Sequence, residues 1–161
     1  MLTHKQTQFA VPEKTEDGGW KLPPADVMGN CFATCVACLL DLDPSVVPNF
    51  AAKRGDWWAS FQDWLVERGY FAIEIDHKNP DEPAAFWPLP GDVLCIINGK
   101  SPRGDYTHSV IGKTEVVDAA CRQTRFVWVH DPHPSNEWVG EVRSITFVVP
   151  MPRFDRQEAI A

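Results

Sequence analysis

The sequence lacks a hydrophobic run long enough to cross a membrane. None of its apolar stretches approaches the roughly 18 residues that a membrane-spanning helix requires. Residues 1–9 also lack the apolar segment that a signal peptide carries. These two absences predict a cytoplasmic protein without a membrane partner.

Basic residues are scarce as well. The 15 Lys and Arg are outnumbered by 22 Asp and Glu, and the formal net charge is −7 with histidine neutral. A protein that binds nucleic acid nonspecifically needs a basic face, because it must neutralise phosphate charge. The composition therefore predicts no nucleic-acid partner.

Cysteines are few and odd in number. The chain has five, and three of them fall within one apolar run, where helical neighbours do not bridge readily. In the absence of an export signal, this pattern predicts reduced thiols rather than a framework of disulfide bonds.

The remaining composition is that of an ordinary folded domain. Hydrophobic residues make up 44% of the 161 and charged residues 23%, and this length is sufficient for a single domain, residues 1–161, with a substantial core. The Pro- and Gly-containing residues 10–27 predict a surface loop, and the polar residues 153–161 predict a flexible tail.

The periodicity of the sequence places helices before strands. Helices are expected from Cys31 and over residues 56–69, where Asp56 is the predicted N-cap. Extended segments follow, and these are residues 71–75, 93–97, 107–112, 126–130 and 145–149. Helices first and strands afterwards predict an α+β domain in which a helical half packs on an antiparallel sheet.

Cys31 is the predicted nucleophile. Gly29 and Asn30 predict a turn and an N-cap, and the apolar run that begins at Cys31 contains neither Gly nor Pro. Cys31 would then lie in the first turn of a helix, where free backbone N–H groups and the helix dipole favour an anion. A thiolate is such an anion, so this position lowers the pKa of a cysteine toward the reactive range.

A thiol nucleophile needs a base, and the base needs a group that orients it. His108 begins one predicted strand, and Asp131 directly follows another. If these strands form an antiparallel hairpin, the start of one lies beside the end of the other and brings Asp131 next to His108. Asp105 and Asp118 are alternative orienting residues for His108.

This order of residues resembles the papain-like cysteine peptidases, and most nearly their compact peptidase C39-like and NlpC/P60-type domains. Four segments also resemble a group of small bacterial and phage proteins, and these are residues 29–31, 47–50, 108–110 and 129–135. The resemblance implies a papain-like fold and a thiol hydrolase that cleaves a peptide or amide bond with Cys31, His108 and Asp131. It implies a peptide or protein substrate and no metal or cofactor.

The resemblance also implies an oxyanion hole built from the nucleophile's backbone N–H and an upstream glutamine side chain. Residues 25–27 hold no glutamine. Gln6 and Gln8 are the available glutamines. Gln6 is favoured, because a Gln-Thr segment before the cysteine recurs in the small-protein group, and Asn30 is the local alternative. The predicted substrate cleft draws on Trp87, His130, His133 and Trp138.

Other functions fit parts of the sequence. The spacing Cys-x3-Cys-x2-Cys, formed by Cys31, Cys35 and Cys38, is typical of the iron–sulfur cluster of radical SAM enzymes. Ala37 replaces the usual aromatic residue of that motif, and the chain is short for the barrel that carries it. A noncatalytic papain-like binding module, acting as a bacterial or phage accessory protein, remains an alternative, as do deamidation and acyl transfer.

Overall fold

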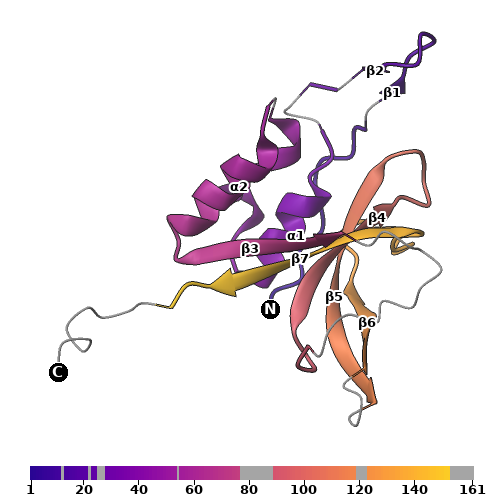
Figure 1. The fold of residues 1–161 in the computed structure, drawn as a ribbon. Coiled ribbons are helices and arrows are strands. Elements are labelled where there is room, and N and C mark those ends of the chain that lie inside the picture. Colours follow the sequence, from indigo (N-terminus) through magenta and orange to yellow (C-terminus); the bar gives the residue numbers. More distant parts are fainter. Residues whose placement is uncertain are drawn as a thin grey trace, which may run out of the picture.

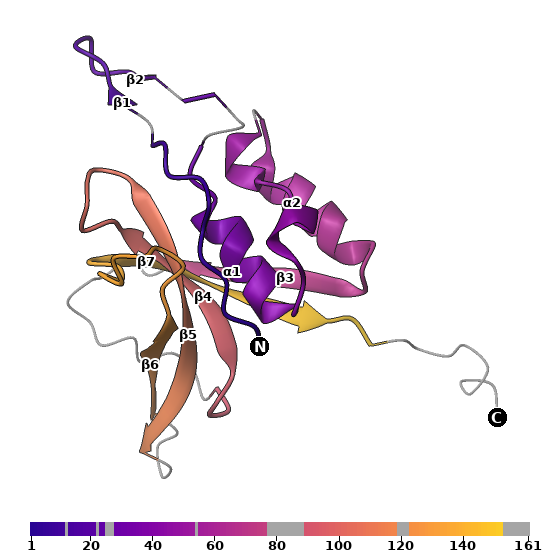
Figure 2. The same ribbon diagram turned by 180° about the vertical axis from the view of Figure 1, so that it is seen from behind.

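The structure is a computed structural model that describes residues 1–11, 13–21, 23–24, 28–53, 55–76, 89–118 and 123–152. It has an α+β architecture, in which a five-stranded antiparallel sheet carries helices α1 and α2 on one face (Figures 1 and 2). The helical segments are α1 (Cys31–Leu39), the short 3₁₀ helices η1 (Pro44–Val46) and η2 (Phe50–Ala52), and α2 (Trp57–Val66). The predicted tail, residues 153–161, lies outside the described part.

The sheet contains all five predicted strands. They are β3 (Tyr70–Asp76), β4 (Leu94–Lys100), β5 (Thr107–Asp118), β6 (Gln123–His130) and β7 (Val142–Pro150), in the order β3-β7-β4-β5-β6. Strand β5 continues well past residue 112, because its polar second half pairs with β6 through partners such as Glu115 and Arg125.

The segment predicted as a surface loop, residues 10–27, contains a short hairpin that the sequence did not predict. Within this segment, β1 (Glu13–Lys14) and β2 (Trp20–Lys21) form a short antiparallel pair. The turn between them is closed by backbone hydrogen bonds between Thr15 and Gly19 and between Gly18 and Thr15. Gly18 there adopts φ 83°, a conformation that glycine accepts readily. This hairpin extends away from the five-stranded sheet (Figure 1).

Apolar side chains cover both faces of the sheet. On one face, α1 and α2 bury Cys35, Val36, Phe61 and Leu65 against Ile96 and Ile111 of the central strands. On the other face, the alternate residues of the same strands, Cys95, Ile97 and Val110, pack with Val139, Ile145 and Phe147. Burial on both sides fixes the register of the central strands, because a shift by one residue would exchange the two faces.

Helix α1 is more deeply buried than α2. Seven consecutive residues, Phe32 to Cys38, are buried, as expected for an apolar run without a polar face. Helix α2 is amphipathic, and the Asp56 side chain accepts a hydrogen bond from the backbone N–H of Ala59 at 2.9 Å, which confirms the predicted N-cap.

Residues 1–10, here called the N-terminal strap, run past the start of α1 (Figure 2). The Asn30 side-chain oxygen accepts hydrogen bonds from the backbone N–H groups of Thr7 and Gln8, each at 3.2 Å. On its other side, the strap bonds to the turn after β6, where Gln6 N donates to Pro132 O at 3.0 Å. The strap therefore joins the first turn of α1 to the end of β6.

No single helix in the described ranges is both long and apolar enough to cross a membrane; α1 and residues 44–52 together pass such a test only as a pair bent by 114°.

Candidate active site

Cys31 is the first residue of α1 and lines a pocket of about 620 Å³. Its sulfur lies close to the ring of His108, and the two side chains interact. Burial alone would raise the pKa of the Cys31 thiol. The interaction with His108, through hydrogen bonding and charge, outweighs burial with a smaller contribution from Ser109, and the pKa of the thiol falls below its ordinary value. The start of this helix therefore carries a thiol that ionises easily.

His108 lies between Cys31 and Asp131. Its Nε2 atom donates a hydrogen bond to Oδ1 of Asp131 at 2.8 Å, and both side chains are almost fully buried. An ionised carboxylate only accepts hydrogen bonds, so this contact holds the proton on Nε2 and leaves Nδ1 to face the thiol. Burial acts to lower the pKa of His108, but the hydrogen bonds to Asp131 and Cys31 raise it above its ordinary value.

Asp131 is itself held in place by backbone donors. Oδ1 accepts from the backbone N–H of His133 and Oδ2 from that of Trp138, both at 2.8 Å. Burial acts to raise the pKa of Asp131, but the bonds from His108 and these two N–H groups lower it. The carboxylate therefore stays ionised and fixed in orientation while it supports the imidazole.

The position of Asp131 follows from the β5–β6 pairing. Ile111 of β5 pairs with His130, the last residue of β6. The chain then turns at Asp131 beside the start of β5, where His108 lies. The hairpin inferred from the sequence is therefore confirmed, and it is what brings these two side chains together. Of the alternative orienting residues, Asp105 lines the pocket without bonding to His108, and Asp118 is exposed at the far end of β5.

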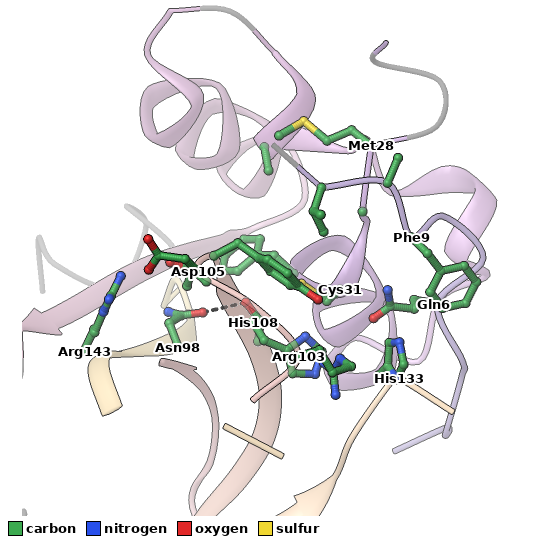
Figure 3. Close-up of a pocket in the computed structure, with 18 of the residues that line it drawn as sticks. Gln6, Phe9, Met28, Cys31, Asn98, Arg103, Asp105, His108, His133 and Arg143 are labelled. Atoms are coloured by element: carbon green, nitrogen blue, oxygen red, sulfur yellow. Dashed lines mark hydrogen bonds between the residues drawn. The ribbon is translucent and has the colours of Figure 1, made fainter. Parts of the chain in front are cut away.

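Gln6 reaches the pocket from the N-terminal strap. Its side chain is 8% exposed and lines the same cavity as Cys31 and His108 (Figure 3). One N–H of its amide donates to Gln8 O at 3.0 Å, and the amide oxygen is buried without a partner among the described residues. In the part of the chain that the structure describes, the second N–H has no acceptor. Gln6 therefore presents a buried side-chain amide to the cavity that holds Cys31.

Asn30 does not take that position. Its side chain faces the strap, where it accepts from Thr7 N and Gln8 N and donates to Thr7 Oγ1 at 3.3 Å. It makes no side-chain capping bond to α1, so the predicted N-cap contact is absent. The backbone donors of the strap compete for the amide oxygen. Asn30 thus acts as an anchor for the strap and is not among the residues that line the pocket.

The four residues predicted to line the substrate cleft lie in different places. His133 lines the pocket, its ring edge-on to His108 with centroids 6.1 Å apart. His130 instead bonds to His4 O at 2.7 Å, and Trp138 stacks on Trp128 at 6.1 Å, so neither is among the lining residues. The prediction for these two was wrong because both side chains have neighbours outside the cavity. Trp87 lies outside the described residues.

The floor of the pocket is a polar row that the sequence did not predict. Ser109, Asn98 and Ser144 occupy paired positions on β5, β4 and β7. Ser109 Oγ donates to Asn98 Oδ1 at 2.8 Å (dashed in Figure 3). Asn98 Nδ2 donates to Ser144 Oγ and Thr146 Oγ1, each at 3.2 Å. Ser, Asn and Thr are common residue types, and these residues become recognisable as a connected row only because they align across three neighbouring strands.

Apolar and charged residues form the rest of the pocket. Phe9, Met28, Phe32 and Trp57 supply apolar walls. In Figure 3, Arg143 and Asp105 lie on one side of Cys31, and Gln6, Phe9 and His133 lie on the other. The thiol is therefore near the middle of the cavity, with a charged end and an aromatic end.

The other helix cysteines are engaged separately. Cys35 Sγ donates to Ser109 O at 3.5 Å, and Cys38 Sγ accepts from His4 N at 3.2 Å. Burial raises the pKa of both thiols. In the part of the chain that the structure describes, no group of three or more His, Cys, Asp or Glu side chains is arranged to hold a metal ion.

Comparison of the chain with models of protein families, with curated proteins and with solved structures finds no significant match.

Proposed function

We propose that the protein is a thiol hydrolase that cleaves a peptide or amide bond, with Cys31 as nucleophile, His108 as base and Asp131 as orienting residue. The observation that carries this proposal is the arrangement of Cys31 beside His108, whose ring is hydrogen-bonded to the buried Asp131 at 2.8 Å. Each member has the pKa direction that the reaction requires: low for the thiol, high for the imidazole and low for the carboxylate.

The proposed reaction has two stages. The Cys31 sulfur attacks the carbonyl carbon, and the thiol proton resides on His108. As the carbon–nitrogen bond breaks, His108 gives this proton to the leaving amine, and a thioester remains on Cys31. Water then attacks the thioester and transfers a proton to His108, which returns it to the departing sulfur. A different acceptor in this second stage would give acyl transfer, and a side-chain carboxamide as substrate would give deamidation.

Two donors are available for the negative oxygen that forms in each stage. The backbone N–H of Cys31 lies in the first turn of α1, where no preceding helical carbonyl can accept from it. The second is the free N–H of the Gln6 amide. Oxyanion donors of this kind contribute about 10²–10³ in rate when they are fixed in advance. The bonds from Gln6 N to Pro132 O and from its side-chain amide to Gln8 O provide that fixation.

We infer further that the fold is of the papain-like type. A helix that begins with the nucleophile packs on an antiparallel sheet whose adjacent strands carry the histidine and the aspartate. The iron–sulfur alternative has less support, because its three cysteines lie within one continuous helix and two of them have other partners. The binding-module alternative predicts the same fold but an unreactive Cys31.

The test is the alkylation of each cysteine by iodoacetamide at neutral pH, followed by mass spectrometry. Cys31 should react far faster than Cys35, Cys38 and Cys95, since burial raises the pKa of Cys95 to about 12. In His108→Ala, Cys31 should lose its faster rate of alkylation. The Cys31→Ala variant gives the background labelling of the other cysteines. Slow labelling of Cys31 in the folded wild-type protein would contradict the proposal and favour the binding module.

Hydrolysis itself is tested with an ester that releases a coloured alcohol. A burst of product equal to the enzyme concentration, with a thioester adduct on the Cys31 peptide, is expected from the wild-type protein. The Cys31→Ala variant should give neither signal. Rapid alkylation without any acyl adduct would indicate a reactive thiol that does not support hydrolysis.

A further inference from the structure

One end of the pocket carries charges of both signs. Arg143 and Asp105 lie there, on the side of Cys31 away from Gln6 (Figure 3). Glu74 lines the same cavity and is joined to the polar floor, because Ser144 Oγ donates to Glu74 Oε1 at 2.6 Å. A guanidinium and two carboxylates therefore border the cavity that holds the thiol.

These charges are not neutralised by one another. Among the described residues, the side chains of Arg143 and Asp105 form no hydrogen bond or ion pair, and Glu74 bonds through its side chain to Ser144 alone. All three side chains are exposed. Arg103 differs, although it lines the same pocket, because it donates to Ser135 Oγ at 3.0 Å and Glu137 Oε2 at 3.4 Å.

The floor next to these charges offers little to a ligand. Asn98 uses its oxygen to accept from Ser109 and its amino group to donate to Ser144 and Thr146. A buried row that is satisfied internally gives shape to a pocket without demanding a partner. Recognition at this end therefore depends on the exposed charges.

We propose that this end of the pocket recognises a zwitterionic amino-acid head group. Arg143 binds its carboxylate, and Asp105 and Glu74 bind its ammonium. The inference rests on the proposed hydrolase and names its substrate class, a small amide that carries such a head group at a distance from the scissile bond. A cavity of about 620 Å³ is within the usual range for small-molecule sites.

The chemistry of the groups supports this pairing. A guanidinium presents two parallel N–H donors that match a carboxylate, and an ammonium has three donors that can be shared between two carboxylates. A ligand with only one charge would pair either with Arg143 or with the two carboxylates, and the other group would be left without a partner of opposite charge. A head group with both charges meets all three side chains.

The test uses chloroacetamide probes, which alkylate Cys31 by displacing chloride. Nε-chloroacetyl-lysine carries the zwitterion, its Nα-acetyl derivative only the carboxylate, its carboxamide only the ammonium, and N-butyl chloroacetamide neither. The measured quantity is the second-order rate of Cys31 alkylation for each probe relative to the butyl probe. We expect a ratio of about tenfold or more for the zwitterion, the effect of a few exposed charge contacts.

The variants separate the two charges. Arg143→Gln should reduce the ratio for probes with a carboxylate, and Asp105→Asn should reduce it for probes with an ammonium. Arg125→Gln and Asp63→Asn alter net charge equally, but at exposed positions on β6 and α2 outside the pocket, and should change no ratio. Each ratio compares two probes on the same variant, so a mutation that slows Cys31 toward all probes leaves the ratio unchanged.

Two results would overturn the inference alone: normal iodoacetamide labelling of Cys31 with a zwitterion ratio near one, or a high ratio that Arg143→Gln and Asp105→Asn leave unchanged. A Cys31 that iodoacetamide does not label faster than the buried cysteines would instead overturn the proposed hydrolase, and this inference with it.

Discussion

Nε2 of His108 and Oδ1 of Asp131 lie 2.8 Å apart, and both side chains are almost completely withdrawn from solvent. The two are 23 residues apart in the chain, yet the contact is as short as a charge-assisted hydrogen bond. Because the carboxylate fixes the proton on Nε2, it decides which nitrogen of His108 faces the thiol.

Removal of the Asp131 carboxylate should disable the base. In Asp131→Ala, His108 loses the partner that raises its pKa and holds its tautomer, and ester hydrolysis should fall by about 10²-fold or more. Asp131→Asn keeps one acceptor oxygen and should retain intermediate activity. Steady-state kinetics of both variants are the measurement, with circular dichroism as a check of folding. Equal activity of wild type and Asp131→Ala would contradict the assigned role.

Reactivity should depend on pH in a way that reflects both partners. The lowered pKa of Cys31 means that the thiolate persists at a pH where an ordinary thiol is protonated, so the acid limb of alkylation should lie below that of a free cysteine. The raised pKa of His108 means that its proton, needed by the leaving amine, is lost only at higher pH. Hydrolysis should therefore follow a bell-shaped profile.

The control for this profile is His108→Ala. Without the imidazole, burial is the main influence on Cys31, and the alkylation limb should move upward in pH. Iodoacetamide rates measured across the pH range in both proteins provide the comparison. If the pH dependence of alkylation were the same in both proteins, His108 would not influence the pKa of the thiol.

The roles of Gln6 and Asn30 can be distinguished by comparing ester hydrolysis with alkylation in a variant of each residue. Gln6→Ala should lower ester hydrolysis by about 10²-fold, because one oxyanion donor is lost. It should affect iodoacetamide labelling much less, since alkylation at a saturated carbon forms no oxyanion. Asn30→Ala removes an anchor of the strap and should affect both reactions in parallel. The ratio of the two rates in each variant is the readout.

Lys5 should matter more than an exposed lysine usually does. Its ammonium donates to Asp131 O at 2.7 Å, His133 O at 3.3 Å and Asn136 Oδ1 at 2.7 Å, which uses all three of its protons. Lys5→Met should reduce the free energy of unfolding by about 1 kcal/mol and slow Cys31 alkylation, because the turn that holds Asp131 loosens.

Lys113→Met is the matched control for Lys5. Lys113 forms an ion pair with Asp92 at 2.6 Å between exposed side chains, a kind of contact that contributes little. Urea denaturation of both variants gives the comparison. Similar stability and similar Cys31 reactivity for the two would mean that Lys5 does not organise the turn.

Asn98 is expected to be a stability residue. Asn98→Ala would leave the hydroxyls of Ser109, Ser144 and Thr146 without their buried partner, at a cost of about 2–3 kcal/mol. Ser109→Ala removes one of these bonds and should cost about 1 kcal/mol. Urea unfolding followed by tryptophan fluorescence measures both, and equal effects would argue against a connected row.

The elements with strong local patterns could be predicted from the sequence. The apolar run from Cys31 has no breaker, and Asp56 caps the next helix as expected. His108 and Asp131 were predictable as a pair, since they belong to one hairpin. The length of β5 was not, because its second half is polar and becomes a strand only by pairing with β6.

The residues that the sequence did not identify gain their roles from contacts between distant segments. Lys5 and Asn98 are common residue types, and nothing in their local sequence marks them. Lys5 meets a turn more than a hundred residues away, and Asn98 is meaningful only because Ser144 and Thr146 of β7 lie beside β4. Such alignment depends on the strand order β3-β7-β4-β5-β6, which local periodicity does not encode.

The N-terminal strap has a consequence for the timing of synthesis. Lys5 and Asp131 are 126 residues apart, and at 5–20 residues per second a ribosome needs about 6–25 s to add that much chain. Until β5 has been made, Cys31 has no His108 to lower its pKa, and until Asp131 follows, His108 lacks the partner that raises its own pKa. The nascent chain therefore carries a thiol of ordinary pKa, and the lowered pKa arises only after β5 and β6 have left the ribosome.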